Sequence, residues 1–308
     1  MKVLITAAYN TRRFSPFIIE QAKSLQKLGV QIEFFGIEGK GLLGYLKNRK
    51  NLIPKIKEFQ PHIIHAHYGL SGLLANLQRK VPVITTYHGS DINNSKILRF
   101  SKIAMRLSVH NIFVSQKNIN TSGIKKRFEL IPCGVDVDLF KPTDDRLEAK
   151  KQMNLDILKK HVLFAGAFDN QVKNVVLAKE AISQLNEVEL LELKGYSREQ
   201  VMLLMNAADV VLMTSFTEGS PQFIKEAMLC NCPIVSVDVG DVKEIFGDTQ
   251  GCYLSEQRTP EDVAEKLQQA IAFGKRTNGR ERILDLGLDI NTVAQKVLAV
   301  YKAITKID

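Results

Sequence analysis

The chain has no tryptophan, and its 308 residues include only four cysteines and nine prolines. Four cysteines in a chain of this length are too few for the disulfide framework of a small secreted domain. Cys230 and Cys232 are separated by one residue, which is not a usual spacing for zinc ligands or for a redox dithiol. These absences exclude a disulfide scaffold and a zinc ribbon, and we expect reduced thiols in a cytoplasmic protein.

Long hydrophobic runs are also missing. No apolar run approaches the ~20 residues that a membrane-spanning helix needs, and residues 1–10 are apolar too briefly for the core of a signal peptide. No low-complexity tract interrupts the chain, and its hydrophobic content of 45% is ordinary for a globular protein. The sequence therefore predicts a chain that is folded throughout and has no membrane anchor.

Acidic residues are scarce in the first half. Residues 1–142 contain 22 Lys and Arg against 8 Asp and Glu, whereas residues 143–308 contain 20 against 25. This asymmetry suggests two bodies with different partners, and a basic body fits an anionic membrane surface, nucleic acid or a polyanionic substrate. No recognition motif or aromatic-rich platform accompanies the charge, so nucleic acid is not an expected partner.

Two segments of the basic half are amphipathic, namely Gly39–Lys57 and Lys96–Leu107. Basic amphipathic helices are typical of proteins that lie on a membrane surface. The alternative is that their apolar faces pack in the core while Lys and Arg face water. We expect peripheral binding to the inner face of the membrane, where a lipid-linked or saccharide acceptor would be available.

Strand and helix signals alternate along both halves of the chain. Apolar runs suited to buried parallel strands occur at Val3–Ala7, Val30–Phe35, His62–His67, Val81–Tyr87, Asn111–Ser115, His161–Ala165, Leu190–Leu193, Val210–Thr214, Ile234–Val237 and Cys252–Leu254. Segments with helical spacing separate them. This rhythm predicts βαβ units and an α/β fold with two parallel sheets, and the charged stretch 138–145 is the expected connection between them.

The loop after Val210–Thr214 carries the strongest local signal. In open α/β sheets, ligands bind outside the carboxyl ends of the strands. Ser220 is suited to cap the following helix and Pro221 to its first position, so the helix start would offer N–H groups to an anion. Gly219 lets a ligand approach the backbone closely.

Two glutamates flank this helix start. Glu218 lies just before it, and Glu226 lies about one and a half turns inside it. Carboxylates accept hydrogen bonds well from sugar and ribose hydroxyls. The alternative is that both acids only stabilise the positive end of the helix dipole.

The string Thr217–Met228 resembles the signature of the family 4 retaining glycosyltransferases, which have the GT-B fold. Further strings are similar to other segments of that family, in the same order, over nearly the whole chain: His65–His67, Thr86–Asp91, Ile131–Pro142, Asn206–Ser215 and Cys232–Glu244. The resemblance implies two Rossmann-like domains that face each other across a cleft. Residues 1–140 with about 290–308 would bind the acceptor, the C-terminal helix crossing back, and residues 141–289 would bind the nucleotide sugar.

The resemblance also implies roles for single residues. Glu218, His88 and Lys173 are the catalytic candidates. The donor-binding candidates are Gly166, Lys173, Glu218, Gly219, Ser220, Pro221, Gln222 and Glu226. Two departures from the family pattern stand out. Ala167 occupies a position where the family usually has a phosphate-binding Arg, and no glycine pair follows the first strand.

Weaker candidates for the acceptor or phosphate side come from the first half: Asn10, Arg12, Arg13 and Asp91. His65 and His67 lie at i, i+2 on a strand and face the same side, but no third ligand is evident, so no metal site is expected. The family works without a divalent metal, and the resemblance implies no cofactor beyond the nucleoside-diphosphate sugar that serves as donor substrate.

The expected reaction moves a sugar from a nucleoside diphosphate to an acceptor hydroxyl with retention of configuration, in the synthesis of cell-surface polysaccharide or glycolipid. Two alternatives remain at this point. A sugar-nucleotide epimerase of the same fold would isomerise its substrate without an acceptor. A non-catalytic nucleotide-sugar-binding module would agree with the missing Arg at position 167.

Overall fold

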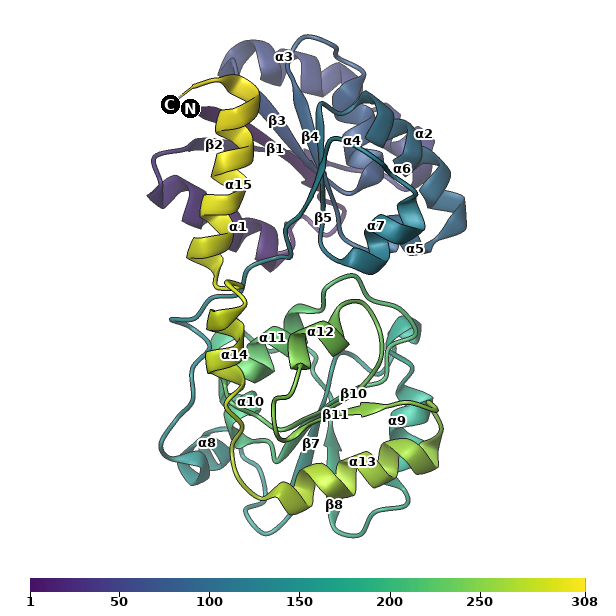
Figure 1. Ribbon diagram of the computed structural model, residues 1–308, viewed down its shortest axis with the longest axis vertical. Helices are drawn as coiled ribbons and strands as arrows, with labels where there is room; N and C mark the ends of the chain where they lie inside the picture. The colour runs from purple at the N-terminus through teal and green to yellow at the C-terminus, as the bar shows by residue number, and fades with distance from the viewer. Residues whose placement is uncertain (308) are drawn as a thin grey trace. The chain divides into compact units, whose positions relative to one another are not determined.

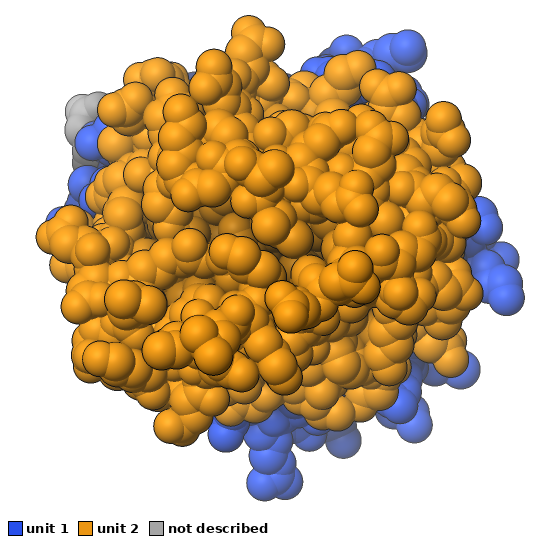
Figure 2. Space-filling model, turned by 90° about the horizontal axis from the view of Figure 1, so that it is seen from below, with its two compact units in different colours: residues 1–134, 290–308 blue, residues 135–289 orange. Residues whose placement is uncertain are grey.

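The structure, a computed structural model, describes residues 1–307. The chain divides into two compact units, of which unit 1 comprises Met1–Gly134 and the segment from Ile290 onward, and unit 2 comprises Val135–Asp289. Figure 1 shows their elements, and Figure 2 colours unit 1 blue and unit 2 orange. In this described part of the chain, no helix is both long and apolar enough to cross a membrane.

Unit 1 is built on a six-stranded parallel sheet of order β2-β1-β3-β4-β5-β6. Its strands are β1 (Lys2–Ala8), β2 (Gln31–Ile37), β3 (Ile63–His67), β4 (Val83–Tyr87), β5 (His110–Phe113) and β6 (Phe128–Leu130). Its helices are α1 (Pro16–Lys27), α2 (Gly41–Leu46), α3 (Arg49–Phe59), α4 (Gly69–Asn76), α5 (Ser90–Asn93), α6 (Ser95–Leu107), α7 (Gln116–Ser122) and α15 (Ile290–Thr305).

Unit 2 is built on a five-stranded parallel sheet of order β11-β10-β9-β7-β8. Its strands are β7 (Lys160–Phe164), β8 (Val188–Leu191), β9 (Val210–Met213), β10 (Ile234–Val237) and β11 (Cys252–Ser255). Its helices are α8 (Arg146–Gln152), the 3₁₀ turn η1 (Gln171–Lys173), α9 (Val175–Ile182), α10 (Arg198–Ala207), α11 (Gln222–Leu229), α12 (Val242–Phe246), α13 (Pro260–Phe273) and α14 (Gly279–Asp285). The two parallel α/β units confirm the fold class expected from the sequence.

The order of the strands indicates where the sheet of unit 2 can bind a ligand. In unit 2 the chain runs outward from β7 in both directions, because β8 lies on one side of β7 and β9 on the other. Such a reversal is a topological switch point, and ligands of open α/β sheets bind at the carboxyl ends of the two strands that form it. The loops that follow β7 and β9 are therefore the ones that can form a site.

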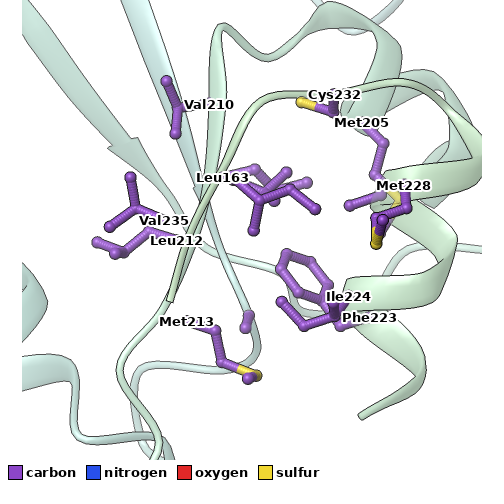
Figure 3. Packing of buried hydrophobic residues seen from close by; sticks show 14 of the residues in the cluster. Leu163, Met205, Val210, Leu212, Met213, Phe223, Ile224, Met228, Cys232 and Val235 are labelled. Atoms are coloured by element: carbon purple, nitrogen blue, oxygen red, sulfur yellow. The ribbon is translucent and has the colours of Figure 1, made fainter. Parts of the chain in front are cut away.

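The core of unit 2 lies between this sheet and its helices. Side chains from β7, α10, β9 and α11 gather in one cluster, among them Leu163, Phe223 and Met228 (Figure 3). All four residues of β9 are buried, as in a parallel sheet covered on both faces. Burying one aliphatic side chain stabilises a fold by about 1.5–3 kcal/mol, so this cluster fixes α11 firmly against β9.

The last helix, α15, belongs to unit 1. Val293, Val297, Val300 and Tyr301 are buried in the same cluster as residues of β1 and α1. In Figure 1 α15 lies beside α1, and contacts between the two helices agree. The C-terminal helix therefore crosses back to the first half of the chain, as expected.

The two basic amphipathic segments are mostly packed into unit 1. The segment Gly39–Lys57 forms two helices, and the apolar residues Leu52, Ile56 and Phe59 of α3 are buried. By contrast, Leu43 on α2 is 75% exposed. On α6, Ala104 and Met105 are buried, whereas Ile103 is 43% exposed, so only part of the apolar face of this helix packs inward. The core interpretation thus holds for α3 and in part for α6.

Candidate functional site

Three of the predicted site residues meet at the switch point of unit 2. Gly166 follows β7, Lys173 ends η1, and Glu218 lies in the loop after β9. The Nζ atom of Lys173 lies 2.7 Å from Oε1 of Glu218. Gly166 has a φ of +150°, and a Cβ atom placed there would approach Cγ of Lys173 to 3.1 Å. Glycine at this position therefore leaves room for the lysine side chain.

The backbone explains why Lys173 comes to lie against Glu218. The hydroxyl of Thr214, at the end of β9, donates to the carbonyl oxygens of Lys173 and Asn174 at 3.0 and 2.9 Å. Two residues further along, the N–H of Phe216 donates to the carbonyl oxygen of Val172 at 3.0 Å. These bonds join the η1 turn to the loop after β9.

The ion pair between Lys173 and Glu218 is accessible from solvent. Their side chains are 21% and 19% exposed, respectively. The ammonium group of Lys173 can bind a second anion, such as a phosphate oxygen, while it stays close to the carboxylate of Glu218. The pair is therefore suited to hold a ligand that carries both negative charge and hydroxyl groups.

The start of α11 differs from the expectation. The helix begins at Gln222, and Pro221 occupies the cap position with an extended ψ of 118°. Ser220 does not cap the helix, because its hydroxyl donates to Oδ2 of Asp241 at 2.6 Å. A hydrogen bond to a carboxylate is stronger than one between neutral groups, and this explains why the serine turns away from the helix. The predicted N-cap was therefore wrong.

The loop after β10 supports the loop after β9. Gly240 has a φ of +59°, and a Cβ atom placed there would come within 2.5 Å of the carbonyl oxygen of Gly219. This close approach, together with the bond from Ser220 to Asp241, fixes the backbone just after Glu218. Asp241 was not predicted from the sequence, where only its place after a strand and a glycine signals such a role.

A buried lysine lies beneath the same loop. Lys225 is completely buried, and its Nζ atom donates to Oε1 of Gln222 at 3.1 Å. Burial raises the pKa of Asp241, and the positive charge of Lys225 opposes that rise. Lys225 was not predicted from the sequence, because a lysine on a helix next to Glu226 is normally a solvated residue.

Glu226 has a partner that was not predicted from the sequence. It is buried, and its Oε1 atom lies 2.7 Å from Nη1 of Arg198, the first residue of α10. The guanidinium of Arg198 also lies over the ring of Phe140 at 4.7 Å. Arg198 therefore fixes the position of the carboxylate of Glu226.

In unit 1, His88 lies at the carboxyl ends of β3 and β4, in a cluster of aromatic rings and one cysteine thiol. Its Nε2 atom lies 3.0 Å from Nδ1 of His67, and its Nδ1 atom lies 3.5 Å from Sγ of Cys133. The rings of Phe17 and Tyr68 lie against it at 4.9 and 4.6 Å. Both ring nitrogens of His88 thus have neighbours within unit 1.

Asp91 stabilises the loop that carries His88. Its carboxylate accepts hydrogen bonds from the backbone N–H groups of Gly69, His88 and Gly89 at 2.8–3.1 Å. Burial raises the pKa of Asp91 to about 6, and these N–H groups oppose the rise. With its oxygens used in this way, Asp91 supports the loop rather than presenting a free carboxylate to an acceptor.

His65 and His67 are buried and serve packing. Nδ1 of His65 lies 2.5 Å from the hydroxyl of Tyr301 on α15, and its Nε2 lies 2.7 Å from the hydroxyl of Thr86. Burial lowers the pKa of His65 to about 3 and that of His67 well below its usual value. Among residues 1–307, no group of three or more His, Cys, Asp or Glu could hold a metal ion.

The other candidates of unit 1 lie after β1. The side chain of Asn10 exchanges two hydrogen bonds with the backbone of Gly39, at 2.7 and 3.2 Å. Arg12 and Arg13 are exposed, and neither is in an ion pair with any of the residues that the structure describes. Asn10 thus has a structural role, whereas the two arginines are available to an anion.

Two short sequence segments bear on the binding of phosphate and of a metal ion. Ala167 accepts a hydrogen bond at its carbonyl oxygen from the N–H of Asn170, in the turn that leads to Lys173, and its methyl group cannot bind phosphate. An Asp-x-Asp string of the kind that can hold a cation occurs at Asp136–Asp138. There the Oδ1 atom of Asp136 accepts hydrogen bonds from the N–H groups of Asp138 and Leu139, which forms a turn.

Sequence comparison identifies relatives of both halves. Residues 17–139 match the family Glycosyltransferase Family 4, and residues 161–282 match Glycosyl transferases group 1. An uncharacterized glycosyltransferase of Methanocaldococcus jannaschii is 26% identical over 298 residues, which cover 87% of this chain and 79% of that protein. The amylovoran biosynthesis glycosyltransferase of Erwinia amylovora is 24% identical over 266 residues, which cover 72% of this chain and 64% of that protein. The chain spans 58% and 63% of the length of two further curated glycosyltransferases.

Solved structures share the fold over nearly the whole chain. Sucrose-phosphate synthase from Thermosynechococcus elongatus superposes with a TM-score of 0.85 at 17% identity and covers 99% of both chains. HepE of Anabaena, solved in complex with UDP and glucose, superposes with a TM-score of 0.75 at 17% identity and covers 98% of this chain and 100% of its own. Both halves match in order, and the protein is accordingly a glycosyltransferase of the GT-B fold that belongs to family 4, group 1 type.

Proposed function

We propose that this protein transfers a sugar from a nucleoside-diphosphate sugar to an acceptor hydroxyl with retention of configuration and without a metal ion, and that unit 2 binds the donor. One observation carries the proposal: Gly166, Lys173 and Glu218 meet at the carboxyl ends of β7 and β9, where the sheet has its switch point. The solved relative HepE contains UDP and glucose, which supports a nucleotide-sugar donor.

The chemistry requires stabilisation of the leaving diphosphate. Negative charge develops on the phosphate as the sugar becomes oxocarbenium-like, and fixed cations and N–H groups aimed at that charge supply the largest part of such catalysis. Lys173 supplies a cation, and the start of α11 at Gln222 supplies the positive end of a helix dipole. With Ala167 in place of an arginine, Lys173 bears more of this task.

The hydroxyl groups of the donor need acceptors. Glu218 and the backbone at Gly219, Ser220 and Pro221 are assigned to the sugar and phosphate, and Glu226 to the ribose. Arg198 orients the carboxylate of Glu226 for that purpose. His88 in unit 1 is assigned to the sugar side, as the resemblance implies. No protein nucleophile is assigned.

The acceptor belongs to the synthesis of cell-surface polysaccharide or glycolipid. The relative from Erwinia amylovora that acts in amylovoran biosynthesis supports this assignment. A lipid-linked acceptor would place the protein in the cytoplasm at the inner face of the membrane, and the excess of Lys and Arg in residues 1–142 supports such a location. An epimerase or a non-catalytic module gains no support from the relatives found.

A thermal-shift screen with UDP, GDP and ADP tests the donor site, followed by transfer assays with the matching sugar nucleotides. A nucleotide at one hundred times its Kd should stabilise the protein by about 2.7 kcal/mol. Glu226→Gln should remove most of this effect. If no nucleotide raises the melting temperature, the donor site is wrong. Isomerisation of the sugar nucleotide without an acceptor would instead establish the epimerase.

A further inference from the structure

A concave surface lies entirely within unit 1. Its volume is about 330 Å³, and it is lined by the second half of α6, the end of α7 and the segment leading to β6. Five of the nine lining residues are cationic: Lys102, Arg106, Lys125, Lys126 and Arg127. None of these residues is among the donor-site candidates, so this surface, here called the basic pocket, requires a separate explanation.

No acidic residue lines the basic pocket. Residues 92–128 contain eight Lys and Arg and not a single Asp or Glu. None of the five lining cations is in an ion pair with any residue between positions 1 and 307. Like charges gathered in one concavity repel each other, and an anion bound there would relieve the repulsion. Arg106 in the last turn of α6 complements the dipole of that helix, but this effect accounts for one cation rather than for five.

The wall of the basic pocket is structurally fixed. Arg127 has a φ of +59°, a conformation that an arginine rarely adopts, and its Nη2 atom donates to the carbonyl oxygen of Arg106 at 3.3 Å. The hydroxyl of Ser122 donates to the carbonyl oxygen of Ile119 at 2.7 Å and accepts the N–H of Ile124 at 3.1 Å. The turn that presents Lys125 and Lys126 is therefore held in place before any ligand binds.

We propose that the basic pocket binds a phosphate group, either the headgroup of an anionic lipid or a phosphorylated compound in solution. Guanidinium and ammonium groups that line one concavity without acids match phosphate oxygens in charge and as hydrogen-bond donors. Met105 and Ile124 add an apolar side to the concavity, which suits a phosphate attached to an organic group. The proposal is independent of the donor site in unit 2.

The test compares Lys125→Glu/Lys126→Glu with a matched control, Lys23→Glu/Lys27→Glu on α1. Both variants reverse two exposed lysines of unit 1. Calorimetry with inorganic pyrophosphate, carried out with an excess of the nucleotide that occupies the donor site, measures binding in solution. Sedimentation with phosphatidylcholine vesicles, with and without phosphatidylglycerol, measures binding to a lipid headgroup. The pocket variant should bind the probe that the parent protein binds, pyrophosphate or phosphatidylglycerol vesicles, at least about tenfold more weakly. The control variant should bind like the parent protein.

The two arms identify the source of the phosphate. A selective loss with pyrophosphate assigns a soluble ligand, and a selective loss with phosphatidylglycerol vesicles assigns a lipid. If both variants lose the same fraction of binding to each probe, or if the parent protein binds neither, the proposal is overturned. Nucleotide-induced stabilisation, measured on the same variants, should not change, so a failure here is distinct from a failure of the donor site.

Discussion

The Lys173–Glu218 pair gives two side chains roles that mutation can separate. Lys173→Gln removes the cation that faces the leaving diphosphate, and we expect kcat to fall by about 10²–10³ with a smaller change in KM. Glu218→Gln should lower kcat and raise KM, because the carboxylate orders Lys173 and also binds a sugar hydroxyl. Steady-state kinetics of the two variants and their double mutant measures the coupling.

Lys151→Gln on α8 is the control for this experiment, since it removes an exposed lysine of unit 2 outside the site. Its kinetics should match those of the parent protein. Additive losses in the double mutant would contradict the coupling of Lys173 with Glu218.

His65 predicts how stability depends on pH. Burial lowers its folded pKa to about 3, whereas the unfolded chain has an ordinary histidine pKa near 6.5. Below pH 6.5 the unfolded state binds the proton first, so stability is fully present above this pH and is lost as the pH falls towards 3. The loss is about 1.4 kcal/mol for each unit of pH, and the buried His67 acts in the same direction.

Urea unfolding at several pH values between 7.5 and 5 checks this expectation. The free energy of unfolding of His65→Gln should fall less steeply with decreasing pH than that of the parent protein. The matched control is His62→Gln, which removes an exposed histidine directly before β3. Equal slopes for the parent and His65→Gln would contradict the assignment.

At the scale of elements, the loop after β9 depends on the loop after β10. Gly240→Ala places a methyl group 2.5 Å from the carbonyl oxygen of Gly219 and also strains a backbone with a φ of +59°. We expect a loss of stability of about 1–3 kcal/mol from the clash and a loss of the nucleotide-induced thermal shift, because Gly219 follows Glu218 directly.

Gly195→Ala separates the two effects. Gly195 also has a positive φ, of +82°, but a Cβ atom there meets nothing within 4 Å. This control therefore carries the backbone strain without the clash. Thermal melts with and without nucleotide should show a normal nucleotide shift for Gly195→Ala, and a normal shift for Gly240→Ala as well would refute the supporting role of the second loop.

The sequence predicted most elements of the fold and the segment that carries the site, because apolar periodicity and the Thr217–Met228 string are local signals. It did not predict the partners. Ser220 reads as a helix cap until the structure brings Asp241 within reach, 21 residues further along. Glu226 meets Arg198 from a different helix. Local patterns specify elements, whereas contacts between distant loops depend on the packing of the whole sheet.

At the scale of the whole molecule, the chain passes from unit 1 to unit 2 after Gly134 and returns at Ile290. Unit 1 is therefore discontinuous, and α15 completes its core. A chain that ends at residue 289 loses Val293, Val297, Val300 and Tyr301 from the cluster around β1 and α1. At about 1.5–3 kcal/mol for each buried side chain, the loss is comparable with the ~5–15 kcal/mol that stabilises a whole domain.

Hydrogen exchange measured by mass spectrometry should therefore show unit 1 unprotected in the shortened chain, with protection retained in β7, β9 and β10 of unit 2. Lys302→Ala, on the exposed face of α15, is the control and should leave both units protected. Loss of protection in both units together would show that unit 2 does not fold by itself.

The complete burial of Lys225 makes it a natural reporter of motion in the donor loop. An amine-reactive reagent such as acetic anhydride can modify it only when α11 and the loop before it open, whereas exposed lysines react at once. The labelling rate of this one lysine, read by mass spectrometry, would measure the opening equilibrium directly. A bound donor should slow the labelling, so the same side chain would report occupancy in a protein that has no tryptophan to provide a fluorescence signal.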